Sequence, residues 1–286
     1  MQHRSLEQTV GQLQPEYTEG IIRHTRNSPG GENRVWIVVE DDDDIEVYEK
    51  FFDTERTKVM PSTTREGKKG CAYLEQIVTN LLTLDKDIPV FGIRDTDYTR
   101  YETQPHVFPD SVFATDCRDI ELMMFEAPSV VSELTSWNPG FPAALERCRP
   151  IARHFGYMRI CNYLYDLGCN FKKNVKTSKV RDNNTGALRP DWKEHSLSLF
   201  LTNCKEPFSE QEWRTTILEM KLEQEEDRHI CQGHDVVRLL HYFMSPNDRL
   251  RERMVKAYSL GDFRITRLYT DISGWERARE VSVLAC

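Results

Sequence analysis

The sequence predicts an α/β fold in which a parallel sheet is flanked by helices and followed by a mainly helical C-terminal domain. Short apolar runs rich in β-branched residues, at 35–39 and 88–94, indicate buried parallel strands. Such runs alternate with helical patterns over about a hundred residues, as in βαβ units. After residue 138 the pattern becomes mainly helical. We therefore expect a leader segment (1–33), an α/β domain (34–137) and a helical domain (138–286).

The first half of the expected sheet follows from three stretches. Residues 35–39 read VWIVV and predict the first strand. A helix is expected from about Asp44, because apolar side chains recur near helical spacing from Ile45 to Phe52. A short strand is expected near residues 57–60. These stretches supply one strand–helix–strand unit.

The second half begins at a turn. The glycines and charged residues of 63–70 indicate a loop, and apolar positions between Tyr73 and Leu82 then recur on one helical face. Strands are expected at 88–94 and 112–115, the latter followed by another helix. The expected sheet therefore has at least four strands.

The helical half begins after a chain break at Asn138–Pro142. Ser209 and Glu212 have the spacing of a capping box and predict a helix start. Another helix is expected to open at Gly233-His234-Asp235 and to stop at Ser245-Pro246.

Carboxylates follow three of the expected strands. The groups are Glu40 with Asp41–Asp44, Asp95 with Asp97, and Asp116 with Asp119 and Glu121. In open α/β sheets, functional groups gather at the carboxyl ends of the strands. Each acid alone is also a good helix cap, but no clear apolar helix follows Asp95–Tyr98. Carboxylates that converge at one edge of a sheet repel one another, and a bound divalent cation is the usual way to offset that repulsion. The sequence therefore predicts a metal site.

Composition limits the classes of protein that fit. The chain has 286 residues, of which 39% are apolar and 29% charged. No apolar stretch approaches eighteen residues, and residues 1–20 carry no apolar signal core, so a membrane span and a secretory signal are not expected. The eight cysteines include no Cys-x-x-Cys pair and are expected to be reduced thiols. These features predict a cytoplasmic protein.

The charge of the chain is unevenly distributed. The formal net charge is −8, yet the segment 147–181 contains nine Lys and Arg residues, among them Lys172 and Lys173, against a single acid, Asp166. Aromatic side chains are interleaved with these cations. Such a stretch can hold a phosphate backbone and stack bases. A solvated helix face is an equally good interpretation of the same pattern.

The order and spacing of the acids resemble the toprim fold. That family carries a Glu after its first strand and an Asp-x-Asp after a later one, matched here by Glu40, Asp95 and Asp97, with Asp44 four residues beyond the Glu. The segments Thr115–Glu121 and Gly233–Val237 are similar to toprim-like nucleases of bacterial anti-phage systems, akin to the effector nuclease of the PARIS system and more distantly the OLD nucleases. The toprim resemblance covers about 34–135 and the effector-type resemblance extends weakly to the end. The chain departs from the family at Asp41, where a Gly is usual.

The resemblance implies a metal-dependent endonuclease that hydrolyses nucleic-acid phosphodiesters. Residues 34–137 would be the catalytic domain, with Asp95 and Asp97 as primary ligands of Mg²⁺ or Mn²⁺ and Asp44 and Glu121 completing the site. Glu40 would act as general base or acid and as a further ligand. Four lysines would contact the substrate: Lys68, Lys69, Lys172 and Lys173. Lys68 and Lys69 have an equal alternative as a solvated turn.

The same resemblance implies a biological setting. The substrate would be RNA rather than DNA, with tRNA as a plausible target. Residues 138–286 would serve substrate or partner binding and dimerisation. An ABC-class ATPase partner, a homodimeric active form and a role in abortive infection against phage are also implied, with no membrane involved. The alternative is a catalytically degenerate toprim module that binds an ATPase or nucleic acid without cutting. The retained acids favour the nuclease, while Asp41 keeps the alternative open.

Overall fold

The computed structural model describes residues 17–26, 34–104, 106–182, 185–244 and 249–285. The chain forms two compact units. The first contains 1–95, 107–115 and 260–286, and the second contains 96–106 and 116–259. This division differs from the one expected at residue 138, because the chain leaves the first unit twice and returns to it with its last helices.

The first unit is built on a four-stranded sheet in which every described strand is parallel, in the order β2-β1-β3-β4. The strands are β1 (Val35–Val39), β2 (Thr57–Pro61), β3 (Val90–Arg94) and β4 (Val112–Ala114). Val39 at the end of β1 is in register with Pro61 on one side and Ile93 on the other. The parallel sheet flanked by helices confirms the predicted α/β class. It also makes the two acid-tipped strands, β1 and β3, direct neighbours.

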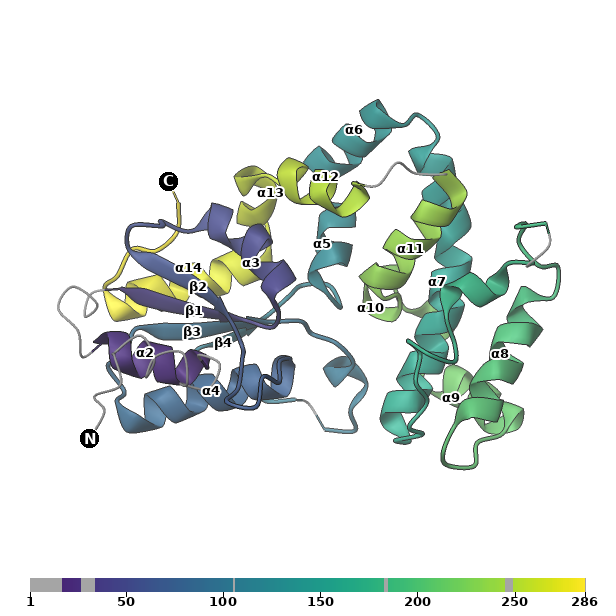
Figure 1. Ribbon diagram of the computed structural model, residues 1–286, viewed down its shortest axis with the longest axis horizontal. Helices are drawn as coiled ribbons and strands as arrows, with labels where there is room; N and C mark the ends of the chain where they lie inside the picture. Colours follow the sequence, from purple (N-terminus) through teal and green to yellow (C-terminus); the bar gives the residue numbers. More distant parts are fainter. Residues whose placement is uncertain (1–16, 27–33, 105, 183–184, 245–248, 286) are drawn as a thin grey trace, which may run out of the picture. The chain divides into compact units, whose positions relative to one another are not determined.

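Helices cover both faces of this sheet (Figure 1). On one face lie α2 (Thr18–Arg26) and α4 (Cys71–Leu84), whose apolar side chains share a core with those of the strands. Gly92 of β3 permits a close approach, because a Cβ atom there would lie 2.5 Å from Leu74 Cδ2. Helix α2 falls in the expected leader segment, and its Ile22 is fully buried. Residues 1–16 and 27–33 of that segment lie outside the described residues.

The opposite face is covered by the C-terminal part of the chain. Helices α13 (Leu260–Arg264) and α14 (Arg267–Arg279) belong to the first unit, together with α3 (Asp42–Tyr48) and the 3₁₀ turn η1 (Glu49–Phe51). Trp275 packs edge-on against Phe91 of β3 with ring centroids 4.8 Å apart, and Phe51 stacks on Phe263 at 4.5 Å. The backbone of Ala285 donates to Phe51 O at 2.8 Å. Residues 260–285 therefore complete the core of the sheet.

The second unit is helical, as expected for the later part of the chain. Its α-helices in the described residues are α5 (Ile120–Glu126), α6 (Pro128–Trp137), α7 (Phe141–Leu164), α8 (Trp192–Asn203), α9 (Glu210–Glu219), α10 (Asp227–Ile230), α11 (Gly233–Met244) and α12 (Leu250–Ala257). Three 3₁₀ turns accompany them: η2 (Thr99–Tyr101), η3 (Thr177–Val180) and η4 (Leu222–Gln224).

Helix α7 is the longest helix in the described part of this unit and packs against α8, α9, α10 and α11. Gly156 allows the contact with α10, since a Cβ atom there would lie 2.2 Å from the carbonyl oxygen of Ile230. The predicted capping box is confirmed at the start of α9, where Ser209 and Glu212 each bond the other's backbone N–H.

Two further expectations concern the whole chain. Within the described residues, no helix combines the length and apolar character needed to cross a membrane. The seven described cysteines are all free, and five of them are buried, as expected for reduced thiols. The predicted helix stop at Ser245-Pro246 lies outside the described residues.

Candidate metal centre

The acids that follow β1 and β3 lie together. Glu40 is the first residue after β1 and Asp95 the first after β3, and these strands are paired in parallel. The backbone N–H of Asp95 donates to Glu40 Oε1 at 2.8 Å. The ends of the two strands therefore lie side by side, with the Glu40 carboxylate against the backbone of Asp95. The role of Asp95 as a metal ligand stays a prediction.

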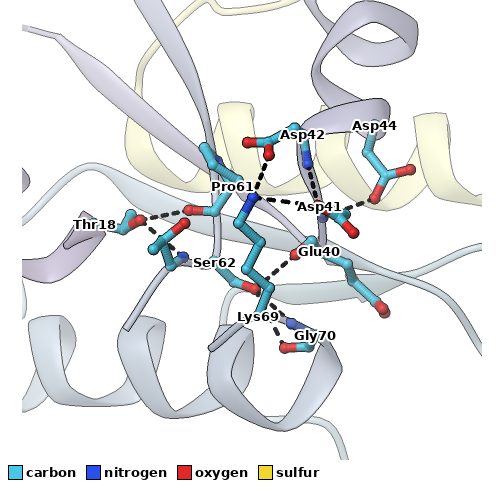
Figure 2. Close-up of polar contacts among 10 residues, drawn as sticks. Thr18, Glu40, Asp41, Asp42, Asp44, Pro61, Ser62, Lys69 and Gly70 are labelled. Carbon is cyan, nitrogen blue, oxygen red and sulfur yellow. Dashed lines mark hydrogen bonds and ion pairs between the residues drawn. The ribbon is translucent and has the colours of Figure 1, made fainter. Parts of the chain in front are cut away.

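A buried serine holds the backbone around Glu40 (Figure 2). Ser62 is fully buried directly after β2, and its Oγ donates to Glu40 O at 2.8 Å. The same oxygen lies 3.3 Å from Gly70 O and accepts from Gly70 N at 3.1 Å. Gly70 has φ +118°, a conformation that favours glycine, and precedes α4. Ser62 thus joins the ends of β1 and β2 to the start of α4.

A buried cation compensates the acids from within the same unit. Arg94, the last residue of β3, is 4% exposed; its Nε donates to Asp95 O at 2.7 Å, and its Nη1 bonds the carboxylate of Glu75. Burial alone would lower the pKa of the Arg94 guanidinium, but its pKa is raised because Cys71, Glu75 and Glu40 surround it. Arg94 therefore offsets part of the repulsion between these carboxylates, which from the sequence we expected a metal ion alone to offset.

Two further candidate ligands lie beside this pair. Only Thr96 separates Asp97 from Asp95, so the chain keeps Asp97 close to the end of β3. Asp97 has φ +48°, a left-handed conformation that Asp tolerates better than most residues. One ligand atom from each of Glu40, Cys71 and Asp97 lies within 4.8 Å of the others, which makes these residues a candidate metal-binding cluster.

The donor atoms of this cluster fit a divalent cation. Two carboxylates and a thiol are negatively charged or can become so, and oxygen ligands suit Mg²⁺ and Mn²⁺. A thiolate is a softer ligand and would favour Mn²⁺ over Mg²⁺. Cys71 was not among the predicted ligands. The only sequence signal for it is its position directly after Gly70, at the first turn of the helix that follows the loop.

The rest of the four-Asp run has a structural role. Asp41 is the N-cap of α3, and its φ of −138° shows an extended backbone that any residue can adopt. Its Oδ1 accepts from Asp42 N at 2.7 Å, and Asp44 Oδ2 accepts from Asp41 N at 3.1 Å to complete a capping box. Asp41 therefore follows Glu40 without backbone strain. Asp44 serves the cap, and its predicted role as a metal ligand stays a prediction.

The two predicted lysines of the turn differ in their surroundings. Lys69 Nζ lies 3.4 Å from Asp41 Oδ1 and also bonds Asp42, as Figure 2 shows. The hydrogen bond to Asp42 is the main reason that the pKa of Lys69 is raised. Lys68 has an exposed side chain. Lys69 is thus engaged by the start of α3, and substrate binding by either lysine remains a prediction.

The third acid cluster lies in the second unit. Asp119 caps α5, with Oδ1 accepting from Leu122 N at 3.0 Å and Oδ2 from Gly233 N at 2.7 Å. Glu121 is 3% exposed, and its Oε1 lies 3.2 Å from Arg251 Nε and 3.7 Å from His234 Nδ1. Burial and the like charge of Glu121 raise the pKa of Asp119. Glu121 is therefore paired with Arg251 of its own unit, and its predicted metal-binding role stays a prediction.

These contacts explain the Gly233-His234-Asp235 sequence. A Cβ atom on Gly233 would lie 2.3 Å from Glu121 Cβ and 2.4 Å from Asp119 Oδ1, so only glycine fits where α11 meets α5. Asp235 is buried and accepts from Arg159 Nε and Nη2 at 2.9 and 3.2 Å. The motif and the third acid cluster form one polar contact across 114 residues of sequence.

The basic segment 147–181 is divided between two roles. Arg153 and Arg159 are engaged inside the unit; Arg153 Nη1 donates to Asp227 Oδ1 at 2.7 Å. Lys172 and Lys173 lie beyond α7 with exposed side chains. The first group supports the fold, and the second keeps its predicted substrate role as a prediction.

No known family profile matches the chain, and no protein of curated function matches it.

Proposed function

We propose that the protein is a metal-dependent nuclease of the toprim type, acting on phosphodiesters. The observation that carries the proposal is the pairing of Glu40 with Asp95 at the carboxyl ends of two adjacent parallel strands. This placement in a parallel sheet supports the toprim interpretation of the sequence, and the third member of the motif, Asp97, is two residues further on.

The residues around this pair suit hydrolysis. A divalent cation held by Glu40, Asp95 and Asp97, with Cys71 beside them, would neutralise charge on a phosphate and on the leaving oxygen. Glu40 accepts a proton from the attacking water, and the Asp95 N–H holds one of its oxygens in place. Arg94 keeps a buried positive charge next to the site, which limits the repulsion between these acids and a phosphate.

The substrate and partners of this proposal come from the resemblance to anti-phage effectors. It supports RNA, with tRNA first, over DNA, and a cytoplasmic homodimer controlled by an ABC-class ATPase. The exposed lysines at 172 and 173 support contact with a nucleic-acid backbone. Co-purification of the tagged chain from its host tests the partner: recovery without an ATPase subunit would remove that part of the proposal.

The activity is tested with the purified full chain, labelled tRNA, plasmid DNA and single-stranded DNA, each with Mg²⁺ or Mn²⁺. We expect cleavage of tRNA that EDTA abolishes and that Glu40→Gln reduces by at least about a hundredfold, as expected for loss of a catalytic acid–base group. Glu46→Gln is the matched control, because Glu46 is an exposed glutamate on the adjacent helix α3. Cleavage at full rate in Glu40→Gln would contradict the assignment. Binding of tRNA without any cleavage would favour the degenerate module instead.

A further inference from the structure

A basic cavity of about 520 Å³ lies within the second unit, between the loop that contains η3 and the helix α11. The loop contributes Lys172, Lys176 and Arg181, and the helix contributes Arg238 and His241. Thr177 and Ser178 add side-chain hydroxyls to the wall. The cavity therefore offers cations and hydrogen-bond donors from two elements that are far apart in sequence.

The charge of this cavity is unbalanced, in contrast to three other cavities of the described chain. Its described lining holds four permanently charged cations and no carboxylate. Each of the other three described cavities contains at least one glutamate beside its cations. Neither Lys172 nor Lys176 forms an ion pair with another described residue. A cavity with this excess of positive charge favours an anionic ligand.

Arg181 is held in place before any ligand binds. The Arg181 guanidinium lies 3.9 Å from the centre of the Tyr242 ring, and its Nε donates to Gly186 O at 3.0 Å. Tyr242 donates to the same carbonyl at 2.8 Å. Ordered side chains lose less entropy when a ligand binds.

Arg238 pairs with a single carboxylate, that of Asp235, which also binds Arg159. Its Nη1 lies 3.7 Å from Asp235 Oδ1, but that carboxylate already accepts two hydrogen bonds from Arg159. The single negative charge of Asp235 is thus divided between two arginines, so the positive charge of Arg238 is only partly neutralised at the cavity. A guanidinium presents paired N–H donors that match the oxygens of a phosphate.

We propose that this cavity binds the phosphate group of a nucleotide, either free or within a nucleic-acid strand. Its volume falls within the range of nucleotide-sized sites, roughly 300–1,000 Å³. The strand-bound form rests on the proposed nuclease function, whereas the free form does not. The residues that line the cavity are all different from those of the candidate metal centre.

The test measures binding by the full chain in EDTA, so that metal-dependent cleavage plays no part. The probes are a fluorescent 12-nucleotide single-stranded RNA, followed by anisotropy, and ATP, followed by calorimetry. The variant is Lys172→Glu with Lys176→Glu, and the matched control is Lys205→Glu with Lys221→Glu, two exposed lysines of the same unit outside the described cavities. Circular dichroism checks that both variants are folded.

We expect the cavity variant to weaken binding of at least one probe about tenfold or more, and the control variant to weaken it less than about twofold. For the RNA, the slope of log affinity against log salt should become shallower by about one, as expected when phosphate contacts are lost. Binding of RNA alone identifies a strand as the ligand, and binding of ATP identifies a free nucleotide. The proposal is overturned if neither probe binds or if both variants weaken binding equally. Loss of cleavage in Glu40→Gln with binding retained separates this result from the test of the nuclease.

Discussion

Stability of the second unit should fall in mild acid because of one buried histidine. His154 lies on α7, is 6% exposed, and packs edge-on against Trp192 and Trp213 with ring centroids 5.4 and 5.5 Å away. Burial lowers its pKa to about 4, outweighing the hydrogen bond to Lys193 O, which raises it. The perturbation is His154→Phe, which keeps an aromatic ring but removes the titrating group.

The magnitude follows from linkage between proton binding and folding. The ordinary pKa of histidine is about 6.5, so the unfolded chain takes up a proton in a range where the folded chain does not. The contribution of neutral His154 is therefore fully present above pH 6.5 and is lost as the pH falls toward 4. With a folded pKa of about 4, the free energy of unfolding drops by about 2 kcal/mol at pH 5 and by about 3 kcal/mol below pH 4.

The assay is urea unfolding followed by tryptophan fluorescence at pH 7 and pH 5. The difference between the native chain and His154→Phe removes the effect of other acids, including Asp119, whose raised pKa acts in the opposite direction. We expect that difference to shift by about 2 kcal/mol between the two pH values. An NMR titration of His154 reports its pKa directly. A pKa of 6 or above, or a difference that is the same at both pH values, would refute the reasoning.

Two further predictions concern positions where one atom decides the packing. Gly233→Ala should lower the free energy of unfolding by about 1–3 kcal/mol, because the new Cβ would lie 2.3 Å from Glu121 Cβ. The control is Gly274→Ala on α14, where the new Cβ meets nothing closer than 3.9 Å and should be tolerated. Equal urea midpoints for the two variants would contradict this prediction. Ser62→Ala should lower the free energy of unfolding by about 1 kcal/mol, because the partly buried backbone groups of Glu40 and Gly70 lose their partner. A thermal melt with no shift relative to the native chain would contradict this.

The sheet was predictable because a buried parallel strand leaves a strong local signal. The apolar runs at 35–39 and 88–94 correspond to β1 and to β3, which is shorter at Val90–Arg94. The helix after the four-Asp run was also expected, although it begins two residues earlier, at Asp42, since the capping acids form its first turn. Local sequence thus contains most of what determines these elements.

The division into units was not predictable in the same way. Nothing local distinguishes α14 from the helices before it, because its assignment depends on Trp275 meeting Phe91 at a distance of 184 residues in sequence. The Asn138–Pro142 break marks only the turn between α6 and α7. The boundaries between the two units depend on contacts between distant segments, and these contacts cannot be inferred from local composition.

The candidate site was predicted in part for a similar reason. Glu40 and Asp95 follow from strand position, because adjacent parallel strands bring their ends together. Arg94 and Ser62 were missed, although Arg94 was read as part of the strand. A buried charge and a buried hydroxyl carry no sequence signal of their own, and their roles appear only when their partners Glu75 and Gly70 are in place.

The return of the chain to the first unit has a consequence for the order of folding during synthesis. The aromatic face of the sheet needs Phe263 and Trp275, which leave the ribosome only after all of residues 116–259 have emerged. The helical unit contains only residues 96–106 and 116–259, and domains generally fold as units as they appear. The sheet is therefore the first structure to be translated and the last to be completed, and until then one of its apolar faces stays open to chaperones.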